Sequence, residues 1–102
     1  MTREPCVYII TNFKRTTFYV GVTSDIVNRI REHREGIYVN SFSKRYRLKY
    51  LVYVSFFESM EEAIAREKQI KGWSRDRKLI LIQGTNPKMQ DLYIEEFIKD
   101  HS

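Results

Sequence analysis

The chain has 102 residues, which predicts one domain, residues 1–102, built around one core. Its 18 lysines and arginines outnumber its 13 acidic residues, so the formal net charge is +5. The excess lies in residues 1–57, which carry ten basic and four acidic side chains. This asymmetry favours an anionic partner, most commonly nucleic acid, and a merely solubilising surface is the alternative.

No apolar run reaches the length of a membrane span, so no membrane partner is expected. Cys6 is the only cysteine, which excludes an intramolecular disulfide and leaves no cysteine–histidine cluster for zinc. We therefore expect a cytoplasmic protein in which oxygen ligands would hold any metal ion.

Two strand-like runs open the chain, residues 7–12 and residues 18–22, on either side of a short basic linker. Period-2 alternation places Tyr8 on one face of the first run, and Tyr19 and Gly21 together on one face of the second. If the runs pair as a hairpin, the two phenol groups can approach each other. Gly21 leaves room beside them because it has no side chain.

A helix is predicted from about Asp25 to Glu35, because capping oxygens precede it and Gly36 can end it in a left-handed conformation. Arg29 and His33 lie beside its buried isoleucine stripe and one turn apart, so they can act together. From these residues alone, a surface arginine and a helix-end histidine stabilised by the helix dipole are the simpler alternatives.

Two basic groups are candidates for phosphate contacts. Lys14 and Arg15 lie in the linker between the first two strands, although exposed loop charges are more often merely solvated. Phe42 and Tyr46 have helical spacing within residues 37–48, which predicts a short helix with an aromatic anchor. The densest basic cluster of the chain surrounds them: Lys44, Arg45, Arg47 and Lys49. Basic residues interleaved with aromatic ones suit nucleic-acid binding, and a solvated helix face is the alternative.

Residues 50–57 form the clearest strand, because they are nearly all apolar and rich in β-branched and aromatic side chains. This composition predicts a central strand covered on both faces by helices.

Ser59 and Glu62 form a capping box that starts a helix running to about Lys71. Its apolar stripe consists of Met60, Ala63, Ile64 and Ile70. Glu67 falls on this stripe, where a carboxylate is costly unless it pairs with a cation or binds a metal. Both alternatives, a structural ion pair and a metal ligand, remain open at this point.

A further helix is predicted from Ser74 to about Gln83, followed by a turn over residues 84–87 and a last helix opened by Asp91. The expected inward-facing residues of these two helices are Leu79, Ile80 and Ile82, then Leu92, Tyr93, Phe97 and Ile98. The order of two strands, two helices, one strand and three helices predicts an α+β fold. It suits a small three-stranded antiparallel sheet flanked by helices.

Five short stretches follow one another in a distinctive order: Cys6-Val7-Tyr8, Tyr19-Val20-Gly21, Asp25 to His33, Glu62 to Trp73, and Asn86 to Tyr93. Together they resemble the GIY-YIG nuclease family, and in particular its small single-domain bacterial members. The resemblance covers nearly the whole chain, with Cys6 standing where the family motif has glycine. It implies the same α+β fold and metal-dependent hydrolysis of a phosphodiester bond.

The resemblance also implies roles for individual residues. Glu67 would hold a divalent ion, Mg²⁺ or Mn²⁺, and Arg29 would neutralise phosphoryl oxygens. Tyr8 would take the proton of the attacking water directly or through a relay, Tyr19 would orient that water or the phosphate, and His33 could assist proton transfer. Asn86 matches an asparagine that braces the site in the family.

The expected function is therefore a DNA endonuclease that is structure-selective or only weakly sequence-specific. One alternative is a module that kept the fold and binds DNA or RNA without cleaving it. Another is a small RNA-binding or stress-related accessory protein. Fold alone would not separate these alternatives.

Overall fold

The computed structural model describes residues 4–36 and 41–93. Three antiparallel strands form one sheet in the order β2-β1-β3, namely β1 (Cys6–Thr11), β2 (Phe18–Thr23) and β3 (Tyr50–Phe56). The helices are α1 (Ile26–Glu35), α2 (Ser41–Arg45), α3 (Met60–Lys71) and α4 (Arg75–Thr85). This confirms the predicted three-stranded antiparallel sheet with flanking helices.

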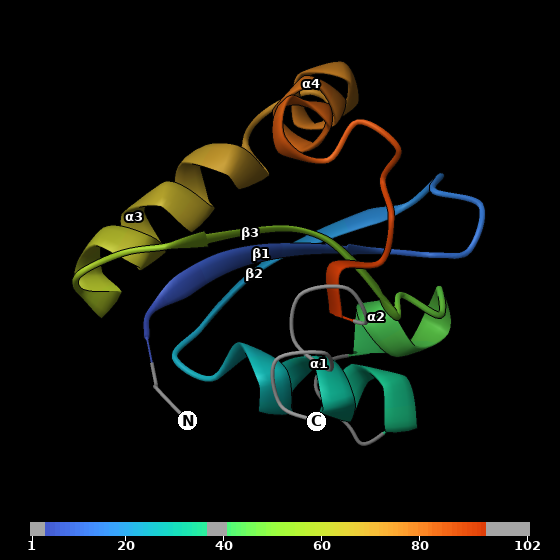
Figure 1. Ribbon diagram of the computed structural model, residues 1–102, viewed down its shortest axis with the longest axis horizontal. Helices are drawn as coiled ribbons and strands as arrows, with labels where there is room; N and C mark the ends of the chain where they lie inside the picture. Colours follow the sequence, from blue (N-terminus) through green and yellow to red (C-terminus); the bar gives the residue numbers. More distant parts are fainter. Residues whose placement is uncertain (1–3, 37–40, 94–102) are drawn as a thin grey trace.

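The sheet lies between two layers of helices, with α1 and α2 on one face and α3 and α4 on the other (Figure 1). Residues of β1 alternate between the two resulting cores. Val7 and Ile9 pack with residues of α3 and α4, whereas Cys6, Tyr8 and Ile10 pack with residues of α1. Because both faces are covered, every residue of β1 is buried. The central strand therefore contributes side chains to both cores, one on each face of the sheet.

The helix ends follow the capping signals in the sequence. The Asp25 side chain accepts the backbone N–H of Asn28 at the start of α1, and Gly36 ends that helix with φ of 72°. At the start of α3, Ser59 accepts the backbone N–H of Glu62 and donates its hydroxyl to the Glu62 carboxylate. These local contacts fix the direction in which each helix leaves the sheet.

The prediction that residues 50–57 form the central strand is wrong, because β3 is an edge strand and β1 is central. The outer edge of β3 is nevertheless covered by the segment that follows α4, which passes along the sheet from one layer to the other (Figure 1). Asn86 Nδ2 donates to the carbonyl oxygen of Val52, and the Asp91 carboxylate accepts the N–H of Leu51. An apolar sequence indicates a buried strand. Here the edge of β3 is covered by side chains of the segment after α4 and not by a fourth strand.

Other predictions of burial were partly wrong. Ile64 of α3 and Ile80 of α4 are exposed, whereas Ala63, Ile70 and Ile82 are buried. Helix α4 continues through Gly84 to Thr85, so the predicted turn begins later, after Asn86. Phe97 and Ile98 lie outside the described residues. Within the described ranges, no helix is both long enough and apolar enough to cross a membrane.

Candidate active site

The antiparallel register of the hairpin brings two tyrosines together on the α1 face of the sheet. Tyr8 lies directly opposite Gly21, and a Cβ atom added at Gly21 would clash with the Tyr8 ring and hydroxyl. The Tyr8 and Tyr19 ring centroids are 6.3 Å apart. The sequence prediction that the two phenols share a face, with Gly21 making room for them, is therefore confirmed.

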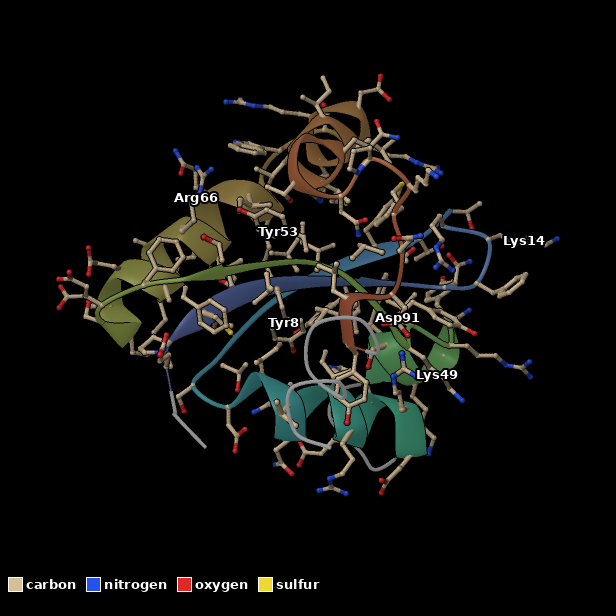
Figure 2. The ribbon with its side chains drawn as sticks, viewed as in Figure 1. Tyr8, Lys14, Lys49, Tyr53, Arg66 and Asp91 are labelled. Carbon is tan, nitrogen blue, oxygen red and sulfur yellow. The ribbon has the colours of Figure 1, made fainter. Side chains whose placement is uncertain are left out.

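His33 of α1 completes a cluster of three rings with these tyrosines. The Tyr8 hydroxyl lies 3.3 Å from His33 Nε2, and the other ring nitrogen, Nδ1, lies 3.1 Å from the Ser43 hydroxyl. The Tyr19 ring centroid is 6.3 Å from that of His33. Tyr8 and His33 are 1% and 6% exposed, whereas Tyr19 is half-buried, so Tyr19 is the ring of the three that faces solvent most. Figure 2 shows Tyr8 between the sheet and α1.

Burial controls the protonation of this cluster. Burial raises the pKa of the Tyr8 phenol above its ordinary value, Tyr19 raises it further, and the Arg29 charge lowers it only in part. Burial and then the Arg29 charge lower the pKa of His33 to about 4. At neutral pH the phenol is protonated and the imidazole is neutral. Tyr8 can then donate to Nε2 when the imidazole proton is on Nδ1, where it faces Ser43.

Arg29 supplies positive charge to the cluster from the same helix. Its positive charge lowers the pKa of both Tyr8 and His33. Its Nε atom lies 3.4 Å from the Glu32 carboxylate, and its side chain is 37% exposed. An exposed and loosely paired guanidinium can exchange that carboxylate for a phosphate.

Glu67 lies on α3, on the other side of the sheet from α1. Its Oε2 atom lies 3.0 Å from Lys71 Nζ, four residues later, and the Lys71 Nζ lies 5.5 Å from the Tyr19 ring centroid. Glu67 is therefore linked to the tyrosine cluster through Lys71. The Glu67 side chain is 13% exposed and that of Lys71 is 46% exposed, so the lysine can move away without being stranded in the core.

The described residues contain no group of three histidine, cysteine, aspartate or glutamate side chains that could hold a metal ion. Glu67 alone still fits Mg²⁺ or Mn²⁺, because Mg²⁺ commonly keeps several waters and binds one or two carboxylates plus substrate phosphates. The fit requires that the ion displace Lys71 from the carboxylate.

The predicted phosphate-binding residues differ in how they are held. Lys14, Lys44, Arg45 and Arg47 are exposed. Arg15 is half-buried, and its guanidinium donates to the carbonyl oxygens of Asn12, Phe13 and Met89. The Arg15 guanidinium therefore joins the β1–β2 loop to the segment after α4.

Asn86 is buried and bonds to the backbone of Val52 and Gln90. Its contacts brace the edge of the sheet.

The sequence analysis did not predict two residues that contact the site, Lys71 and Ser43. Lys71 had a usable signal, because a lysine four residues after a glutamate on a helix is a favoured ion pair. Ser43 had none, since nothing local indicates that a serine beside an exposed phenylalanine contacts a histidine ten residues earlier.

Comparisons with known proteins identify the family of this chain. Residues 4–80 match the family model described as the GIY-YIG catalytic domain. A UPF0213 protein of Syntrophus aciditrophicus is 37% identical over 73 residues, which cover 72% of this chain and 84% of that protein. A UPF0213 protein of Clostridium perfringens is 36% identical over 85 residues, covering 83% and 89% respectively.

A solved structure is also similar. The solution NMR structure of a UPF0213 protein of Bacillus halodurans matches with a TM-score of 0.54 and 28% identity. The match covers 86% of this chain and 92% of that chain. The same fold therefore extends over most of both proteins.

Proposed function

Because the chain belongs to the GIY-YIG family, we propose that it is a metal-dependent endonuclease that hydrolyses phosphodiester bonds of DNA. The observation that carries the proposal is the contact between the Tyr8 hydroxyl and a neutral His33, beside the charge of Arg29. The basic excess of residues 1–57 supports a nucleic-acid substrate. A domain of this size contacts little of a duplex, so we expect structure-selective or weakly sequence-specific cleavage.

Hydrolysis requires a water that loses a proton, offset charge on the phosphoryl oxygens and a stabilised leaving oxygen. Tyr8 with a raised pKa is a poor base by itself, so we assign it a relay. The Tyr8 oxygen accepts the proton of the attacking water while its own proton passes to His33 Nε2. An approaching phosphate, being anionic, raises the pKa of His33 and so opposes the effects of burial and of Arg29.

The remaining residues act on charge and position. Arg29 leaves Glu32 and neutralises phosphoryl oxygens, and Tyr19, the more exposed ring, orients the water or the phosphate. Glu67 would hold the divalent ion once Lys71 has moved aside. When bound, that ion offsets negative charge on the phosphate and on the leaving oxygen.

One alternative function has specific support. Tyr8 is almost fully buried, and Glu67 is already paired with Lys71. Both features would suit a module that binds DNA or RNA through its basic face and does not cleave it.

The experiment that separates these functions is incubation with duplex, branched and single-stranded DNA and with RNA, each with Mg²⁺, with Mn²⁺ and with chelator. The proposal expects metal-dependent cleavage of at least one DNA substrate. A Tyr8→Phe protein purified in parallel controls for contaminating nuclease. Binding without cleavage by the wild type under every condition would establish the alternative.

A further inference from the structure

A pocket of about 440 Å³ opens between the β1–β2 loop and the segment that joins α2 to β3. Its lining consists of Asn12, Phe13, Lys14, Tyr46, Arg47, Lys49 and Tyr50. Three of these side chains are cationic, three are aromatic and none is acidic. Lys14 lies at the tip of the β1–β2 loop and Lys49 lies near α2, at the same end of the molecule (Figure 2).

Hydrogen bonds hold the loop wall of the pocket, although its tip is exposed. The Asn12 side-chain oxygen accepts the N–H groups of Thr16 and Thr17. Arg15 has φ of 59°, in the left-handed region, and its Nη1 donates to the Phe13 carbonyl oxygen over 2.7 Å. Phe13 is nevertheless 75% exposed, so the loop presents an apolar ring to solvent on a fixed backbone.

The opposite wall is also fixed. Leu48 is buried, its N–H donates to the carbonyl oxygen of Ser43, and the N–H of Lys49 donates to the carbonyl oxygen of Thr11. Arg47 and Lys49 flank this anchored leucine and are both exposed. Arg47 has φ of 55°, a conformation that costs a non-glycine residue free energy and that often accompanies binding sites.

We propose that this pocket holds one unpaired nucleotide of a nucleic acid strand, with its base stacked on Phe13 and Tyr46 and its phosphates paired with Lys14, Arg47 and Lys49. The aromatic rings of the lining can stack on the planar base, and its cationic side chains can pair with the anionic phosphates. Tyr50 also lines the pocket; its ring centroid lies 6.2 Å from that of Phe13 and 4.7 Å from the guanidinium carbon of Arg15. The volume falls within the usual range of small-ligand sites.

An unpaired nucleotide fits this pocket better than a base pair does. A base within a duplex has both faces covered by its neighbours, so it cannot stack on a protein ring without leaving the helix. The pocket is also connected to the tyrosine cluster. The Tyr19 ring centroid lies 6.4 Å from that of Phe42, which lies 4.8 Å from that of Tyr46 on the pocket rim. A strand whose phosphate reaches Tyr19 can therefore place a nucleotide a few positions away in the pocket.

This inference deepens the proposed function and rests on its nucleic-acid substrate, but it can be tested without cleavage. The probes are a labelled single-stranded DNA, the RNA of the same sequence and the matched DNA duplex, each titrated with the full chain in chelator by fluorescence anisotropy. Phe13→Ala should weaken binding of at least one single strand by about 5- to 100-fold, the range expected for one stacked base. Duplex binding should change by less than about 2-fold, since no base is stacked there.

Phe56→Ala is the matched control. Phe56 is also an exposed phenylalanine, but it lines a pocket with Glu4 and Glu58, which would repel a phosphate. This variant should leave all three affinities unchanged. Phe13→Tyr should restore single-strand binding, because it keeps the ring.

The inference is overturned if Phe13→Ala binds every probe like the wild type, or loses single-strand and duplex affinity equally. Its failure is distinguishable from failure of the proposed function. A wild type that cleaves DNA while Phe13→Ala binds normally keeps the nuclease and removes the pocket. A wild type that never cleaves while Phe13→Ala loses single-strand affinity keeps the pocket and removes the nuclease.

Discussion

The Tyr8 hydroxyl lies 3.3 Å from His33 Nε2 and so joins the central strand to α1 through the core. The contact is buried, and both groups are neutral at physiological pH because burial raises the pKa of one and lowers that of the other. A proton can therefore move between them without either group carrying a charge at rest.

We predict that Tyr8→Phe removes activity and keeps the fold. The ring still packs over Gly21, but the hydroxyl that would carry the proton is absent, and loss of general-base catalysis typically lowers the rate by about 10² to 10⁴. The matched control is Tyr53→Phe, since Tyr53 is a buried tyrosine in the opposite core (Figure 2). Single-turnover cleavage by both variants is the measurement. Wild-type rates in Tyr8→Phe would remove Tyr8 from the reaction.

We predict that His33 makes the protein less stable in mild acid. Its pKa is lowered to about 4 in the folded state, against about 6.5 when unfolded, so the unfolded chain binds the extra proton between these values. The contribution of neutral His33 to the free energy of unfolding is therefore complete above about pH 6.5, and it is lost as the pH falls towards 4. The free energy of unfolding should drop by about 2 kcal/mol from pH 7.5 to pH 5. Urea melts of wild type and His33→Gln check this, and equal drops in both would contradict it.

We predict that Arg29 acts mainly on turnover, whereas the basic cluster of Lys44, Arg45, Arg47 and Lys49 acts mainly on nucleic-acid affinity. Arg29→Ala should lower turnover more than affinity, because its charge acts on Tyr8 and His33. Lys44→Ala and Arg47→Ala should instead weaken duplex binding and reduce the salt slope by about 0.9 each. Arg31→Ala, an exposed arginine of α1 paired with Glu35, is the control and should change neither quantity. An Arg29→Ala protein with intact turnover would place Arg29 outside the reaction.

We predict that Glu67→Gln abolishes cleavage with little change in stability. Its partner Lys71 is 46% exposed and becomes solvated when the carboxylate is lost, so the change resembles loss of a surface ion pair. Nucleic-acid affinity should remain close to that of the wild type. Glu61→Gln, an exposed glutamate on the same helix, is the control.

Thermal melts with and without Mg²⁺ provide a readout for Glu67 that does not depend on cleavage. A metal-dependent rise in Tm should occur in the wild type and in Glu61→Gln and be absent in Glu67→Gln. A large drop in Tm of Glu67→Gln, independent of metal, would instead identify a structural ion pair.

We predict that Gly21→Ala disturbs the site through packing alone. The added Cβ would collide with the Tyr8 ring, and such overpacking costs about 1 to 3 kcal/mol. Gly84→Ala is a useful contrast, because Gly84 lies within α4 with open space around it and should stabilise the helix by about 0.5 to 1 kcal/mol. Chemical denaturation of both variants measures the difference. Equal stability of Gly21→Ala and the wild type would show that Tyr8 can move without cost.

The parts of this protein that could be predicted from its sequence depend on local chemistry. Period-2 alternation was enough to bring Tyr8, Tyr19 and Gly21 together, and capping residues were enough to place the ends of α1 and α3. The position of β3 could not be predicted, because residues more than thirty positions later cover its edge. Helical spacing alone predicts that Ile64 and Ile80 are buried, because it describes a stripe and not how far the neighbouring sheet extends; both are exposed.

The segment after α4 also affects how copies of this protein behave towards one another. An uncovered edge strand offers unpaired N–H and C=O groups to the strands of other molecules and so promotes aggregation. Asn86 and Asp91 occupy such groups on Leu51 and Val52. We expect a chain shortened before Asn86 to leave these groups unpaired and to aggregate more readily than the full chain.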